Sequence, residues 1–140
     1  MKQILNQLAR CLGKAPFLAD NEGKYHVTID GESLFLCHIG HCLVVRSFLE
    51  LHCQPNNTPV HDLLKLLLCQ VTSWSRQYPQ GLVLNHDGQL LLEARGVLAL
   101  VDISWLERTL AAQVGILEQL KPQLLEAKNH HPRNQAIWRP

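Results

Sequence analysis

The chain has 140 residues, of which 46% are hydrophobic and 18% are charged, and its formal net charge is +1. This length suits one domain with its own core, and the composition is too apolar for a disordered chain. A net charge near zero gives no basic field, so we expect no nucleic-acid partner. The apolar excess predicts a further surface that a protein partner or a second copy covers.

No segment resembles a secretory signal or a membrane span. Residues 1–7 lack an uninterrupted apolar stretch, and polar residues interrupt the chain well before the roughly 18 apolar residues that a span needs. We therefore expect a cytosolic protein without membrane contact. The cysteines are odd in number and lack framework spacing, so reduced thiols are expected. They are Cys11, Cys37, Cys42, Cys53 and Cys69.

The first predicted element is a short helix near the N-terminus. Its apolar stripe, at helical spacing, consists of Ile4, Leu5, Leu8 and Leu12. Gly13 and Pro16 then end the helix, because glycine accepts the left-handed conformation at a helix terminus and proline cannot continue one.

Three β-like runs follow, over residues 25–29, 33–39 and 42–51. Asp30-Gly31 lies between the first two runs, and this pair is typical of a two-residue hairpin turn. The third run does not alternate strictly between apolar and polar residues. That pattern predicts a strand that is covered on both faces or bulged.

A second helix is predicted to begin at Thr58, as N-cap, with Pro59 in its first turn. Apolar residues continue at helical spacing as far as Tyr78, and Pro79 ends the run. Residues 82–92 then predict a second hairpin around Asp87-Gly88, with strands covered on both faces.

The last helix is predicted from Ser104, which forms a Ser-x-x-Glu capping box with Glu107. Pro122 is expected to kink or terminate this helix locally. The composition changes to a polar tail after Lys128, so one domain over residues 1–128 and a flexible tail over 129–140 are predicted. The fold class is α+β, with the order α-β-β-β-α-β-β-α and helices packed on a twisted antiparallel sheet.

The segment from Cys37 to Cys42 is a candidate zinc site, because thiols and imidazoles lie close together in it. If Ile39 and Gly40 form the turn, Cys37 faces Cys42 and His38 faces His41. The cysteines then share one face of the sheet and the histidines the other, so no metal is expected. A thiol- or zinc-responsive sensor using these four residues, with Cys53 as a further ligand, remains the alternative function.

Catalysis is not indicated by any motif for phosphate binding, nucleophilic attack or paired carboxylates, so neither an enzyme nor a cofactor is expected. A hydrolase with a Cys-His pair stays open, because such partners can meet in space from distant positions.

Two hairpin stretches, IDGESLFL at residues 29–36 and LNHDGQLLL at residues 84–92, carry a family resemblance. Together with the order of elements over residues 1–128, they resemble the class I chaperones of bacterial type III secretion, the Tir-chaperone or CesT-like family. The resemblance implies a cytoplasmic homodimer without catalytic activity. Such a dimer binds the extended N-terminal segment of one or more effectors, keeps them soluble and competent for secretion, and aids their delivery to the secretion apparatus. The secretion-system ATPase is a further candidate partner.

The resemblance also implies roles for particular residues. The effector groove would be lined by Ile4, Leu5, Leu8, Leu12, Val27, Ile29, Leu34 and Leu36. The dimer interface would include Leu67, Val71, Trp74, Leu82 and Leu84.

Overall fold

The computed structural model describes residues 2–53 and 58–137, with side chains described as far as residue 126. The elements are α1 (Lys2–Cys11), β1 (Tyr25–Ile29), β2 (Glu32–Ile39), β3 (Cys42–His52), α2 (Thr58–Ser73), β4 (Gly81–Leu84), β5 (Gln89–Val97), the short 3₁₀ turn η1 (Leu98–Leu100) and α3 (Ile103–Ile137). This order confirms the predicted α+β fold.

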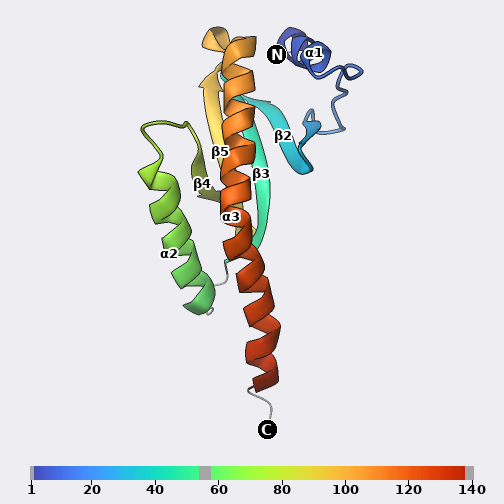
Figure 1. Cartoon of the computed structure of the whole chain (residues 1–140). Helices are drawn as coiled ribbons and strands as arrows, with labels where there is room; N and C mark the ends of the chain where they lie inside the picture. The colour runs from blue at the N-terminus through green and yellow to red at the C-terminus, as the bar shows by residue number, and fades with distance from the viewer. Residues whose placement is uncertain (1, 54–57, 138–140) are drawn as a thin grey trace.

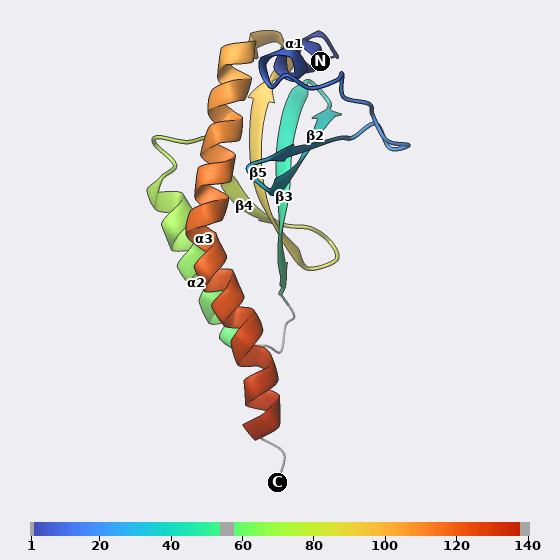
Figure 2. The same ribbon diagram turned by 45° about the vertical axis from the view of Figure 1, so that its right-hand side comes forward.

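Over the described residues the strands form one five-stranded sheet in the order β1-β2-β3-β5-β4, with antiparallel neighbours throughout. Helix α3 runs lengthwise along one face of the sheet, with α2 beside it and α1 near its N-terminal end (Figures 1 and 2). We call the face against α3 the inner face and the opposite one the outer face.

The hydrophobic core lies between the inner face and the helices. Leu34, Leu36 and Leu43 of the sheet are fully buried there, as are Leu106 and Leu120 of α3. The N-terminal part of α3 lies very close to β5. A Cβ atom built on Gly96 would lie 2.6 Å from the Trp105 ring, so a residue without a side chain is needed at this crossing.

One polar side chain joins α3 to the inner face. The buried Gln113 side chain donates from Nε2 to Ser47 Oγ at 3.0 Å and to the Leu92 carbonyl oxygen at 2.9 Å. These bonds connect α3 with β3 and β5 and satisfy the buried Nε2 donor, whereas Gln113 Oε1 has no hydrogen-bond partner among the described residues.

Two tight turns set the register of the first three strands. Asp30 and Gly31 have φ angles of 51° and 81°, which is the type I′ geometry expected for Asp-Gly. The second turn differs from the expectation. Ile39 pairs with Cys42, so the turn residues are Gly40 and His41 rather than Ile39 and Gly40. Gly40, with φ 59°, supplies the positive φ that a type II′ turn requires at its first central position.

Strand β3 is bulged, as its irregular pattern predicts. Its register against β5 shifts between Phe48 and His52, and Glu50 within this interval has a φ of 55°. In β5, Leu90, Leu91 and Leu92 are all buried, so side chains on both faces of this strand are shielded from solvent, as expected. In β4 the expectation is wrong, because Val83 and Leu84 are 38% and 46% exposed at the edge of the sheet.

The cap of α3 is Asp102, not Ser104. Asp102 Oδ1 accepts a hydrogen bond of 2.7 Å from the Trp105 N–H, three residues on, and its carbonyl accepts from the Leu106 N–H. This is N-cap geometry, and Ser104 already lies inside the helix. The predicted capping box is therefore wrong, because the helix already begins at Ile103 and its cap lies two residues before Ser104.

Two helix ends also differ from the predictions. Helix α2 ends at Ser73, where the Ser73 hydroxyl donates to the Gln70 carbonyl oxygen and the chain passes into turns before Pro79. Helix α3 is not terminated at Pro122, because Leu120 and Leu124 on either side pack against the core. The backbone helix continues to Ile137, past the expected domain boundary at residue 128. Residues 138–140 of the expected tail lie outside the described residues.

Candidate functional site

The residues predicted to line the effector groove divide into buried and accessible sets. Those with 2% of their surface exposed or less are Leu5, Leu8, Val27, Leu34 and Leu36. Ile4 and Ile29 are partly buried against the same core, and Leu12 is 38% exposed.

The buried set belongs to the core of this chain because the stripe of α1 packs inward, toward α3 and the inner face. In this arrangement its side chains are not available to a partner, so a charge at Leu8 would test folding rather than partner binding. An amphipathic stripe does not reveal from sequence whether it covers its own sheet or a partner. The groove role of all eight residues stays a prediction, and Ile4, Leu12 and Ile29 are the members that keep accessible surface in this arrangement.

The residues predicted for the dimer interface are similarly divided. Leu67 and Val71 of α2 are in the core, Trp74 and Leu82 are half-buried, and Leu84 on the edge strand β4 is 46% exposed. The exposed leucines of α2 are instead Leu66 and Leu68. Helical spacing identifies α2 as amphipathic, but its neighbours decide which leucines turn outward.

A row of side chains on the outer face was not predicted from the sequence. His26, Phe35, Arg46 and Glu93 are cross-strand partners in β1, β2, β3 and β5, so they form one line across the sheet. The His26 and Phe35 rings stack with centroids 4.9 Å apart, and Phe35 meets Phe48 edge-on at 5.6 Å. The row therefore has an aromatic end, formed by His26 and Phe35, and a charged end, formed by Arg46 and Glu93.

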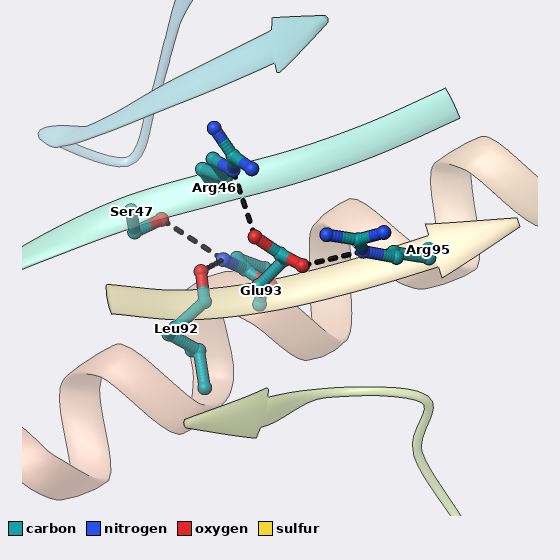
Figure 3. A network of polar contacts seen from close by, with 6 residues as sticks. Arg46, Ser47, Leu92, Glu93 and Arg95 are labelled. Atoms are coloured by element: carbon teal, nitrogen blue, oxygen red, sulfur yellow. Dashed lines mark hydrogen bonds and ion pairs between the residues drawn. The ribbon is translucent and has the colours of Figure 1, made fainter. Parts of the chain in front are cut away.

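The charged end of the row is an ion network around Glu93. Arg46 Nε donates to Glu93 Oε2 at 2.7 Å, and Arg95 Nε donates to Oε1 at 2.6 Å (Figure 3). Burial by itself would raise the pKa of Glu93, but the hydrogen bonds from Arg95 and Arg46 outweigh it and hold the pKa below its ordinary value. One buried carboxylate thus lies between two guanidinium groups.

A cleft of about 340 Å³ opens beside this row, between the β1–β2 turn, the bulged part of β3 and α3. Phe35 and Phe48 line one side, and Leu117 and Leu124 line the other. Lys121 on its border forms a 3.3 Å ion pair with Glu32. Apolar, polar and charged side chains therefore line the cleft together.

The cysteines and histidines considered for metal binding do not converge. Among the described residues, no group of three or more His, Cys, Asp or Glu side chains could hold a metal ion. Cys37 is buried on the outer face, whereas His38 and His41 are exposed. Burial raises the pKa of the Cys37 thiol, which disfavours the reactive thiolate. No described helix is long and apolar enough to cross a membrane.

Known proteins are similar to this chain in sequence and in fold. The family model described as the Tir chaperone protein (CesT) family matches residues 3–121. The chain is 40% identical to the chaperone protein YscB of Yersinia pestis over 126 residues, which cover 89% of this chain and 91% of that protein. YscB of Yersinia enterocolitica matches to the same extent.

Solved structures share the same fold. The ExsC-ExsE complex matches with a TM-score of 0.66 and 17% identity, over 88% of this chain and 92% of that one. The Yersinia pestis type III secretion chaperone SycH, solved with a fragment of YscM2, matches with a TM-score of 0.60 and 20% identity, over 85% and 98%. The chain belongs to the Tir chaperone protein (CesT) family, and this confirms the resemblance read from its hairpins.

Proposed function

We propose that this chain is a cytoplasmic bacterial chaperone that binds an extended N-terminal segment of one or more type III effectors and catalyses no reaction. The observation that carries the proposal is the 40% identity to a secretion chaperone across 89% of the chain. Similar folds have been solved as chaperone-effector complexes, as with HopA1-SchA. A disordered segment can wrap a large surface and become ordered only on binding, which keeps an effector soluble and unfolded for secretion.

The test is affinity isolation of the tagged chain from the bacterium that encodes it, with mass spectrometry and limited proteolysis of the proteins that co-purify. We expect a larger protein in which an N-terminal segment is protected. Recovery of the chain without such a partner would contradict the proposal. Stoichiometric zinc, lost on changing Cys37 and Cys42 to Ser, would favour the sensor instead.

A second copy of the chain is the proposed occupant of the surface formed by α2 and β4. Its support is the exposure of Leu66, Leu68 and Leu84 beside an edge strand that has unpaired backbone groups. Sedimentation equilibrium should give a dimer, and Leu66→Glu should shift it toward monomer. Leu100→Glu is the matched control, because Leu100 is exposed in η1. A monomeric wild-type chain, or a complex with a different chain alone, would overturn self-association.

The C-terminal segment after residue 128 is proposed to contact the secretion machinery, with its ATPase as the candidate. A chain ending at residue 128 should still capture the effector but support less secretion. Unchanged secretion would remove this role, and loss of capture would assign the segment to effector binding.

A further inference from the structure

The outer face differs from the predicted groove because it is accessible in the folded chain. No helix of the described residues covers it (Figure 2). Val44 and Leu91 on this face are buried but lie outside the core cluster that joins the inner face to the helices. Their cross-strand partners on this face are Arg95 and Phe48.

The charges of the ion network are unbalanced. Arg46 and Arg95 carry two positive charges against the single carboxylate of Glu93, which is only 6% exposed. Within the described part of the chain, both guanidinium groups bond to this carboxylate through Nε alone. Figure 3 shows the Glu93 carboxylate between the two guanidinium groups. Two sets of charge-assisted donors therefore remain for a second carboxylate.

Apolar side chains flank the charged row on the same face. Phe48 is 45% exposed on one side of the row, and Ile39 and Val97, near the β2–β3 turn, are 41% and 48% exposed on the other. Side chains that share a face of a strand are two residues apart, at a spacing of roughly 6.6 Å. An extended segment lying along β3 would present alternate residues at that same spacing.

We propose that the outer face binds an extended peptide segment whose acidic side chain is held by the Nη groups of Arg46 and Arg95, with apolar residues on both sides contacting Phe48 and Val97. The proposal rests on the proposed function, since the segment belongs to the secreted partner. Charge complementarity selects the acidic residue, and the exposed apolar side chains select its neighbours. Glu93 holds the two arginines in place and does not itself contact the segment.

The test begins with a random 12-residue peptide library displayed on phage and selected against the intact wild-type chain. Peptides that bind should be enriched in an acidic residue with apolar residues on both sides. For one selected peptide, Glu→Gln should weaken binding to the wild-type chain about tenfold, because a charge-assisted hydrogen bond is lost. Binding should also weaken as salt is added.

Arg95→Gln is the diagnostic variant of the chain. Arg95 is half-exposed, so its replacement leaves the Arg46–Glu93 pair and should leave the fold intact, which circular dichroism verifies. On this variant the preference for the acidic peptide over its Gln form should be smaller than on the wild type, because Arg46 alone remains to hold the carboxylate. Arg108→Gln is the matched control, because it removes the same charge from an exposed site on α3. Phe48→Ala should weaken both peptides equally.

The proposal is overturned if no peptide is enriched, if the enriched peptides lack acidic residues, or if Arg95→Gln binds them as the wild type does. It is also overturned if Arg95→Gln dissolves a dimer, because the occupant would then be a second copy. A captured effector that binds Arg95→Gln normally would contradict this inference and leave the proposed function standing. If acidic peptides bind but no effector is captured, the peptide-binding surface is supported and the proposed function is contradicted.

Discussion

The two faces of the sheet use the same strands in different ways. On the inner face, side chains such as Leu36 and Val45 are fully buried under α3, and the polar Gln113 is held by two hydrogen bonds. On the outer face, burial depends on ions and rings that lie within the sheet itself, around Glu93 and Phe35. Packing on the inner face therefore stabilises the fold, and residues of the outer face can bind a partner without disturbing the core.

The largest difference between the faces should appear in their response to truncation. Leu36→Ala should lower the free energy of unfolding by about 2–5 kcal/mol, because the fully buried side chain leaves a cavity on the inner face. Urea denaturation measures this loss. Leu100→Ala, at an exposed site, is the control and should change stability by less than about 0.5 kcal/mol. Equal effects would mean that the inner face is not the core.

The ion network should make the outer face sensitive to pH. Because the folded pKa of Glu93 is depressed, its ionised form stabilises the fold above the unfolded-state pKa of about 4.3. That stabilisation is lost as the pH falls through the folded pKa. Glu93→Gln should cost about 1–2 kcal/mol at pH 7 through two weakened charge-assisted bonds.

Unfolding of the wild type and of Glu93→Gln, measured from pH 7 to pH 3, checks this prediction. The difference between the two proteins should shrink toward acid. A difference that stays constant with pH would show that Glu93 acts through packing rather than through its charge.

The cap of α3 offers a smaller test of how the helix is held over the inner face. Asp102→Ala should destabilise the chain by about 1 kcal/mol, because the Trp105 N–H loses its acceptor. Ser104→Ala should have little effect, since Ser104 lies inside the helix. Thermal unfolding of both variants distinguishes the two residues, and the reverse order would restore Ser104 as the cap.

The smallest effect on stability is expected for Phe48, an exposed apolar side chain on the outer face. Phe48→Ala should cost about 0.5 kcal/mol, because the half-exposed ring loses mainly its edge contact with Phe35. Calorimetry can measure this change. A loss as large as that of Leu36→Ala would remove the distinction between the two faces.

The order of the elements could be predicted from the sequence, because apolar periodicity and turn residues are local signals. The Asp30-Gly31 turn, the start of α2 at Thr58 and the irregular third strand were all readable in this way. The same kind of local signal gave the wrong N-cap for α3, because Ser104 fits a capping box while Asp102, two residues earlier, is the residue that caps the helix.

Which apolar residues lie on the surface and which lie in the core became clear from the packing of the elements. Leu5 and Leu66 look alike as members of helical stripes, yet one is buried under the fold and the other is exposed. The network of Arg46, Glu93 and Arg95 has no sequence signature, because strand register brings together charges that are 47 positions apart along the chain. Periodicity specifies the apolar face of an element, but contact between distant elements determines what that face meets.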